Sequence, residues 1–327
     1  MRRPPNTSST GSPNGWVARD PRVPLDLTTS RNSHQEHEMN SSLPSTNEFR
    51  LGGELPINRL GFGAMRLPCN GFRGPARDPE TGRAVLRRAV ELGVNHIDTA
   101  EFYQSTDGSV RANALIREAL YPYRSNLVIA TKVGVVFNPD GSHRPATGAD
   151  MRRLVEENLS SLGLDRLDLV YLRIGEMTVP HGESLAERFE ALAALRAEGL
   201  IRHLGISNVD IGHFNEARAI APIAAVQNNF HIAKREDLSL LKACEEAGIA
   251  FCPFFPLGGG MGEIDDGRLA RVAGRHGATP SQIALAWLLA SSPVMLAIPG
   301  TGSVEHLQEN VAAGGISLTE EDHAELA

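Results

Sequence analysis

From Phe49 to the end of the 327-residue chain, short apolar runs alternate with longer segments in which apolar residues recur every three or four positions. The short runs have the length of buried strands, and the longer segments have the period of amphipathic helices. We predict eight strands, over residues 59–65, 95–98, 127–132, 167–173, 203–207, 224–228, 250–254 and 294–299. We predict seven helices between them, over residues 81–92, 110–120, 149–162, 184–198, 211–220, 237–247 and 280–289.

Strands that alternate with helices are typical of a parallel sheet, and eight such units predict an α/β fold of the (β/α)8 TIM-barrel type. The competing doubly wound sheet is disfavoured because no G-x-G-x-x-G follows the first strand. The segment FRLGGELPINRL, residues 49–60, precedes the first barrel strand and predicts a β-hairpin that turns at Gly52 and Gly53. We expect this hairpin to close the bottom of the barrel.

Residues 1–48 differ from the rest of the chain, being rich in Pro, Ser, Thr and Asn and lacking aliphatic periodicity. Such a segment cannot bury enough apolar surface to offset the entropy of ordering. We therefore expect a disordered N-terminal tail, followed by one barrel domain over residues 49–327.

The formal net charge of −7 is small, and acidic and basic residues are interspersed through the barrel segment. No basic stripe favours nucleic acid, and no basic amphipathic helix favours a membrane, so we expect a small-molecule partner. Cys69, Cys244 and Cys252 lack C-x-x-C spacing, which disfavours a disulfide framework and a structural zinc site and favours a reducing cytoplasm. No H-E-x-x-H sequence or comparable cluster indicates a catalytic metal.

Polar side chains stand where five predicted strands end. The catalytic face of a TIM barrel is formed by the carboxyl ends of its strands, and polar residues there suggest a site. These residues are Asp98, Lys132, Arg173, the pair Ser207 and Asn208, and the pair Gln227 and Asn228.

Tyr103 follows Asp98 by five residues, and Lys132 ends the next strand, which together suggest an acid catalyst. A phenol has a pKa of about 10, too high for efficient proton transfer at neutral pH, and a neighbouring ammonium group lowers it. A shift to about 7 needs roughly 4 kcal/mol, the Coulomb energy of one cation at about 4 Å with an effective dielectric constant near 20. Two alternatives stay open: a structural Asp98–Lys132 ion pair, or a Lys132 that forms a Schiff base with an aldehyde.

The motifs HIDTAEFY, IATK, GISN, VQNNF, FFPLGGG and IPGTGSVEHLQEN together resemble those of the aldo-keto reductases, over the chain from about Phe49 to its end. Within that family, GVNHID, REALYPY and FFPLGG are most similar to the bacterial pyridoxal reductase branch. The resemblance implies that Tyr103 donates a proton, that Lys132 and Asp98 tune it, and that a nicotinamide cofactor lies across the barrel mouth.

The resemblance also implies a set of cofactor contacts. Ser207, Asn208 and Gln227 would hold the nicotinamide carboxamide, and Phe255 would stack on the ring. The loop Pro256, Leu257, Gly258 and Gly259 would follow the pyrophosphate, where glycines permit close backbone approach. The remaining contacts, to the 2′-phosphate and the adenine, would come from Gly300, Thr301, Ser303, His306, Glu309 and Asn310.

Three positions depart from the family pattern. Gly300 and His306 stand where many members carry a lysine and an arginine for the 2′-phosphate, so we expect NADP(H) but keep NAD(H) open. Arg173 stands where the family has a histidine, and an arginine does not release its proton at working pH. Three roles remain for its cation: stabilising a developing alkoxide, lowering the Tyr103 pKa, or binding an oxyanion of the substrate.

We therefore predict an NADP(H)-dependent reductase of an aldehyde or ketone, with pyridoxal as the expected substrate. One alternative is a general reductase of aromatic or sugar aldehydes. Another is a cofactor-sensing regulatory subunit with little turnover, which would tolerate the change at Arg173.

Overall fold

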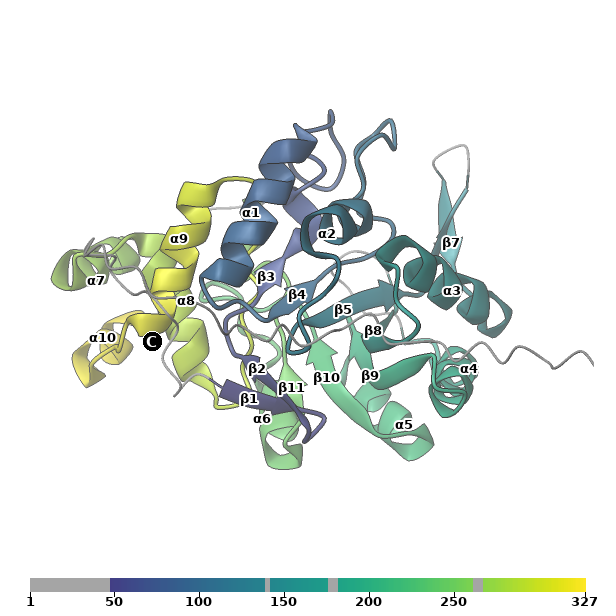
Figure 1. Ribbon diagram of the computed structural model, residues 1–327. Helices are drawn as coiled ribbons and strands as arrows, with labels where there is room; N and C mark the ends of the chain where they lie inside the picture. The colour runs from purple at the N-terminus through teal and green to yellow at the C-terminus, as the bar shows by residue number, and fades with distance from the viewer. Residues whose placement is uncertain (1–47, 139–141, 176–181, 261–266) are drawn as a thin grey trace, which may run out of the picture.

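Seven parallel strands form the curled sheet at the centre of the chain, in the order β11-β10-β9-β8-β5-β4-β3 (Figure 1). The computed structural model describes residues 48–138, 142–175, 182–260 and 267–327. The strands are β3 (Phe62–Gly63), β4 (His96–Asp98), β5 (Val128–Val133), β8 (Leu167–Arg173), β9 (Ile201–Ser207), β10 (Ile223–Gln227) and β11 (Ala250–Phe251). Each lies within a predicted strand or overlaps most of one, although β3 and β11 are shorter than predicted.

Residues 294–299, predicted as the eighth strand, connect the two edges of the sheet. They are too irregular to be assigned as a strand, but isolated parallel bridges join Met295 to Phe251 and Ala297 to Leu60. The Leu296 amide donates to the Phe251 carbonyl at 2.8 Å, and the Ala297 amide donates to the Arg59 carbonyl at 2.8 Å. This segment therefore closes the ring between β11 and β3, which gives the predicted barrel.

The seven predicted helices are all present, and their ends lie within two residues of those predicted. They are α1 (Pro79–Glu91), α2 (Ala112–Leu120), α3 (Met151–Leu162), α4 (Ala186–Ala197), α5 (Ile211–Ile220), α6 (Leu238–Ala247) and α8 (Pro280–Ser291). Helices surround the sheet on its outer side (Figure 1). Helix α1 begins at Pro79 and not at residue 81 as predicted, because Asp78 caps it. The Asp78 side chain accepts a hydrogen bond from the Thr81 amide at 2.9 Å, and Pro79 occupies the first helical position.

Several elements were not predicted from the sequence. They are α7 (Arg268–His276), α9 (Val304–Ala312), α10 (Glu320–Leu326) and the hairpin of β6 (Val135–Phe137) with β7 (His143–Pro145). Two of these helices carry a recognisable start: Ser303 caps α9, and Thr319 forms a capping box with Asp322 at the start of α10. Attention to capping residues could therefore have found both.

The predicted N-terminal hairpin is confirmed as β1 (Glu48–Leu51) and β2 (Leu55–Asn58), paired antiparallel. Gly52 and Gly53 form its turn with φ of 60° and 79°, values that favour glycine. Leu51 and Ile57 are fully buried and pack with barrel-interior residues, which agrees with the expected closure of the bottom. Glu48 thus belongs to β1, while the rest of the predicted tail lies outside the described residues.

Across the described ranges, no helix is long and apolar enough to cross a membrane. The three cysteines are buried and form no disulfide with one another. Within the same ranges, no three His, Cys, Asp or Glu side chains gather as they would around a metal ion.

Candidate active site

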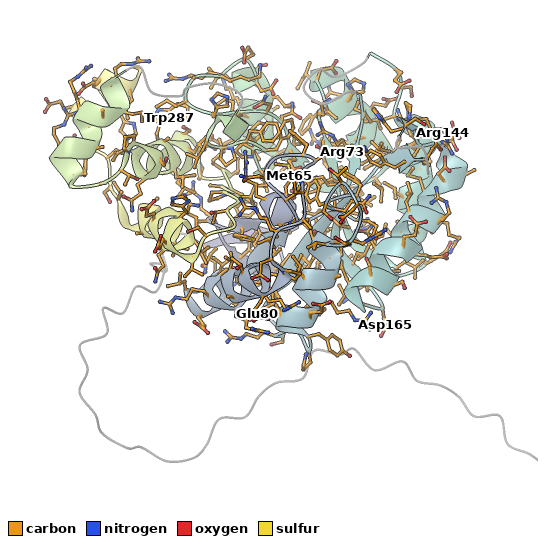
Figure 2. All side chains as sticks on the ribbon, turned by 90° about the horizontal axis from the view of Figure 1, so that it is seen from above. Met65, Arg73, Glu80, Arg144, Asp165 and Trp287 are labelled. Carbon is orange, nitrogen blue, oxygen red and sulfur yellow. The ribbon has the colours of Figure 1, made fainter. Side chains whose placement is uncertain are left out.

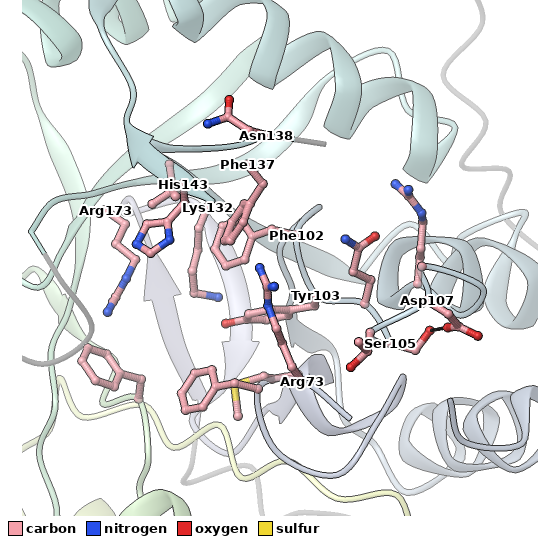
Figure 3. A pocket seen from close by; sticks show the side chains of 18 of the residues that line it. Arg73, Phe102, Tyr103, Ser105, Asp107, Lys132, Phe137, Asn138, His143 and Arg173 are labelled. Atoms are coloured by element: carbon pink, nitrogen blue, oxygen red, sulfur yellow. Dashed lines mark hydrogen bonds between the residues drawn. The ribbon is translucent and has the colours of Figure 1, made fainter. Parts of the chain in front are cut away.

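The polar residues predicted at the strand ends lie at one edge of the sheet, and two of them, Lys132 and Arg173, line a pocket there (Figure 3). Asp98 ends β4, Lys132 lies next to the last residue of β5, and Arg173 ends β8. Ser207 and Gln227 end β9 and β10. Because these strands are parallel and neighbouring, their last residues share one edge, and the structure brings this predicted group together.

Asp98 and Lys132 form a buried ion pair in which Nζ lies 2.5 Å from Oδ1, with side chains only 4% and 3% exposed. The ammonium group also donates to the Thr99 carbonyl oxygen at 2.9 Å. Burial alone would lower the pKa of Lys132, but the charges of Asp98 and the neighbouring Tyr103 outweigh it, so the pKa is raised. Lys132 is therefore a cation fixed in place.

Gln227 binds the other oxygen of Asp98, since its Nε2 donates to Oδ2 at 2.8 Å. This places Gln227 in the same network as the ion pair, a contact that sequence reasoning did not foresee. Its Oε1 is buried and has no hydrogen-bond partner among the described residues. A buried acceptor without a partner is costly, so this oxygen is suited to an amide donor such as a carboxamide.

Tyr103 lies in the loop after β4, and its backbone is held at both ends: its amide donates to Ala100 at 3.0 Å and its carbonyl accepts from Ala112 at 2.9 Å. The Lys132 ammonium lies 4.8 Å from the centroid of its ring. Figure 3 shows the phenol and the Lys132 side chain pointing into the same part of the pocket. The loop therefore places the phenol beside the buried cation.

The prediction that Lys132 brings the pKa of Tyr103 down towards 7 is not met in this structure. Burial of the phenol raises its pKa above 10, although Lys132 and Arg173 act in the opposite direction. The negative charge of Asp98, which sits against Lys132, acts in the same direction as burial and opposes the effect of the cation. Tyr103 is thus a neutral phenol at neutral pH, the form that can give up a proton.

Arg173 points into the pocket rather than away from the barrel (Figure 3). Its guanidinium carbon lies 5.0 Å from the centroid of the Phe254 ring, and Nη1 donates to the Ser207 hydroxyl at 3.3 Å. Burial lowers its pKa, while Tyr103 and Asp98 act to raise it. An arginine pKa starts so high that the side chain stays charged, so the site holds a second cation beside Lys132.

Tyr103, Lys132 and Arg173 line a pocket of about 1150 Å³ with aromatic walls. Its aromatic residues are Phe72, Phe102, Tyr103, Phe137, Phe254 and Phe255. Viewed from above, Met65 and Arg73 of the pocket lie near the middle of the molecule, and Arg144 and Asp165 lie towards its edge (Figure 2). Sequence reasoning missed Arg73, Phe137 and His143, which come from the loop before α1 and the unpredicted β6–β7 hairpin.

Among the predicted cofactor residues, Asn208 and Phe255 stand out by their backbone. They have φ of 61° and 57°, and no other non-glycine residue in the described part of the chain has a positive φ. Such strain is held in place by surrounding structure and clusters at functional sites. The Asn208 amide donates from Nδ2 to the Ile174 carbonyl at 2.9 Å. Of the whole predicted cofactor set, only Phe255 also lines the pocket.

The glycine-rich loop and the segment after residue 299 lie beside each other at the end of β3. The Gly259 carbonyl accepts from Arg66 at 2.7 Å, and the Gly63 amide donates to the Pro299 carbonyl at 3.2 Å. Gly300 is packed so tightly that a Cβ there would stand 2.5 Å from the Gly63 carbonyl oxygen. The residues predicted for pyrophosphate and 2′-phosphate are therefore close in space.

The other predicted adenosine residues belong to the start of α9. Ser303 caps the helix, its Oγ accepting the His306 amide at 3.3 Å, and its own amide donates to Thr301 Oγ1 at 3.1 Å. His306 and Glu309 are exposed, while Asn310 is buried.

The Schiff-base alternative is disfavoured by the state of Lys132. Attack on an aldehyde needs a neutral amine, usually provided by a lowered pKa. Lys132 has a raised pKa and a carboxylate at 2.5 Å. The same geometry suits a cation that acts on Tyr103.

The comparison with known families decides the classification. The model of the aldo/keto reductase family matches residues 59–327. The chain belongs to the aldo/keto reductase family. The match covers the barrel and every site residue described above.

Individual members of the family are similar over almost the same region. Pyridoxine 4-dehydrogenase from Escherichia coli K12 is 47% identical over 280 residues, which cover 85% of this chain and 96% of that protein. An uncharacterized oxidoreductase from Schizosaccharomyces pombe is 41% identical over 275 residues, which cover 84% of this chain and 87% of that protein.

Solved aldo-keto reductases share the fold. A thermostable aldo-keto reductase superimposes with a TM-score of 0.72 and 33% identity, covering 85% of this chain and 98% of that one. An aldo-keto reductase from Klebsiella pneumoniae, solved with NADP and acetate, superimposes with a TM-score of 0.71 and 29% identity, covering 86% and 94%. The chain is thus an α/β-barrel oxidoreductase of this family.

Proposed function

We propose that this aldo-keto reductase reduces an aldehyde to an alcohol with NADP(H), and that pyridoxal, reduced to pyridoxine, is its substrate. The observation that carries the proposal is that Tyr103 and Lys132 line one aromatic pocket, with Asp98 paired to Lys132. The similarity to the Escherichia coli pyridoxine 4-dehydrogenase supports the choice of substrate.

Tyr103 is the proton donor in this proposal. A nicotinamide cofactor held beside the pocket would supply the hydride for the carbonyl carbon, and Tyr103 donates its phenolic proton to the carbonyl oxygen. Lys132 stabilises the phenolate that remains, at 4.8 Å from the ring. Asp98 and Gln227 hold Lys132 in position through contacts of 2.5 and 2.8 Å to the two carboxylate oxygens.

Arg173 is the substrate-side cation. Its planar group rests on Phe254 and donates to Ser207, and it lines the same pocket as Tyr103. In this position it can stabilise negative charge that develops on the carbonyl oxygen and accept an oxyanion next to the aldehyde. Pyridoxal has such an oxyanion on its ring, and the phenylalanine walls suit a flat aromatic molecule.

The cofactor would lie from Phe255 to the start of α9. The unpartnered Oε1 of Gln227 and the strained backbone of Asn208 fit a carboxamide at the nicotinamide end. Ser207, adjacent to Asn208, completes that end. Gly258 and Gly259, with φ of 73° and 65°, form the turn that would follow the pyrophosphate.

The proposed setting of the enzyme is the cytoplasm, with residues 1–48 as a tail and 49–327 as the catalytic barrel. Three buried cysteines without a disulfide are consistent with a reducing compartment.

The test compares pyridoxal with 4-nitrobenzaldehyde and a sugar aldehyde such as xylose, following NADPH oxidation and identifying the alcohol product by chromatography. The proposal expects pyridoxal to have the highest kcat/KM and pyridoxine to appear in equal amount to the NADP⁺ formed. Faster reduction of nitrobenzaldehyde or xylose would refute the substrate. Tight NADPH binding with no turnover of any aldehyde would refute the enzyme and favour a cofactor sensor.

A further inference from the structure

Two arginines from the segment that follows β3 converge on the proposed adenosine end of the cofactor site. Arg66 Nη2 donates to the Gly259 carbonyl at 2.7 Å, on the glycine-rich loop. The Arg77 guanidinium lies against Gly302, occupying the space that a Cβ would need, and donates to the Asn70 side chain. Glycine at position 302 is therefore required for this arginine to lie where it does.

Neither arginine has a carboxylate partner among the described residues, although both are half-buried. Asp78, which follows Arg77, points its oxygens at the start of α1, accepting the Thr81 amide at 2.9 Å and the Thr81 hydroxyl at 2.7 Å. Both guanidinium groups are close enough to Cys69 to oppose the rise in its pKa that burial causes. The structure thus gathers two positive charges without local compensation, which favours an anionic ligand.

The surroundings of Arg77 add donors to this charge. Gly302 lies directly before Ser303, the capping residue of α9, so Arg77 lies beside the start of that helix. Helices α1 and α9 lie side by side in Figure 1, with the segment of Arg77 leading into α1. A helix N-terminus carries partial positive charge, which acts together with the arginine on a bound anion.

We propose that Arg77 binds the 2′-phosphate of NADP(H), and that Arg66 binds the pyrophosphate while holding the glycine-rich loop. This inference rests on the proposed use of a nicotinamide dinucleotide. Gly300 has no side chain to supply a charge, and in this inference the charge comes from a different segment, in front of α1. A planar guanidinium can donate two hydrogen bonds to a phosphate, so Arg77 makes the chain prefer NADP(H) over NAD(H).

Calorimetric titration with nucleotide fragments tests the assignment without turnover. The ligands are 2′,5′-ADP, which carries the extra phosphate, and ADP, which lacks it. The proteins are wild type, Arg77→Met, Arg66→Met and the control Arg87→Met, which removes an exposed arginine paired with Glu80 on α1. NADP⁺ and NAD⁺ are titrated in parallel.

We expect Arg77→Met to lower the affinity for 2′,5′-ADP and NADP⁺ by about 10- to 100-fold. Its affinity for ADP and NAD⁺ should stay within about twofold of the wild-type value. Arg66→Met lowers the affinity for all four ligands by similar factors, and Arg87→Met leaves all four affinities unchanged. Arg77→Lys recovers part of the NADP⁺ affinity because it keeps the charge without the fork. Unchanged NAD⁺ binding also shows that the Arg77→Met protein is folded.

The inference is overturned if Arg77→Met lowers the affinity for ADP and for 2′,5′-ADP equally, or changes neither. The proposed function stands in both cases. A wild-type protein that binds neither NADP⁺ nor NAD⁺ refutes the proposed function itself, and the inference with it.

Discussion

Replacing both members of the Asp98–Lys132 pair should harm catalysis less than replacing Lys132 alone. In Lys132→Met the phenol loses a cation 4.8 Å from its ring centroid, worth about 3.5 kcal/mol at an effective dielectric constant of 20. Asp98 then remains as an unopposed negative charge beside Tyr103, which disfavours the phenolate further. We expect kcat to fall by roughly 300-fold.

The double variant Lys132→Met/Asp98→Asn removes two charges that largely cancel at Tyr103. The net electrostatic loss is then about 1–2 kcal/mol, or roughly 5- to 30-fold in kcat. The free energy of unfolding should also be lower in Lys132→Met than in the double variant. A buried charge left without its partner costs about 3–5 kcal/mol, so the single variant is the less stable of the two. The asparagine side chain of the double variant would still accept the hydrogen bond that Gln227 donates to Asp98 in the wild type.

The assay is kcat for NADPH-dependent pyridoxal reduction, together with urea unfolding of each variant under the same conditions. A double variant as slow as Lys132→Met, in a protein shown to be folded, would refute the reasoning. It would mean that Lys132 acts through the position of its amine and not through its charge.

Three further predictions concern other parts of the molecule. His96 is fully buried, and its burial lowers its pKa to about 4. As the pH falls, the imidazole is therefore protonated in the unfolded chain before it is protonated in the folded protein. About 3 kcal/mol of the free energy of unfolding is then lost from pH 6.5 down to pH 4. Urea unfolding of His96→Phe should show a smaller loss over the same pH range. Gly52→Ala should destabilise the protein by about 2–3 kcal/mol, because the new Cβ would overlap the His203 ring. Gly53→Ala has open space around its Cβ and should destabilise the protein by only about 1 kcal/mol. Thermal unfolding of both variants measures the difference. Arg173→Lys should lower kcat/KM for pyridoxal by about 10-fold through loss of the planar fork, and unchanged kinetics would exclude bidentate binding by Arg173.

The sequence predicted the fold well because the strands of the central sheet and most helices carry their own signal. The run from Leu167 to Arg173 forms β8 over the predicted residues, and Ile211–Ile220 forms α5 over the predicted residues. Residues 294–299 behave differently, since their pairing with Phe251 and Leu60 depends on closure of the whole ring. Local pattern alone does not contain that information.

The site was predicted in part. Asp98, Lys132 and Arg173 were found because polar residues at the ends of apolar strands are conspicuous. The raised pKa of Tyr103 was not predicted, because it depends on the balance between burial and the opposed charges of Lys132 and Asp98. Arg77 also escaped notice, since only the folded chain brings residue 77 against Gly302.

Removal of the Tyr103 hydroxyl tests the central claim most directly. The measurement is single-turnover oxidation of bound NADPH by pyridoxal in wild type and Tyr103→Phe, with NADPH affinity determined for both by fluorescence. The account predicts a rate that falls by about 10²- to 10⁴-fold, the usual contribution of a general acid, with NADPH affinity unchanged. A Tyr103→Phe protein that reduces pyridoxal at the wild-type rate would contradict the account.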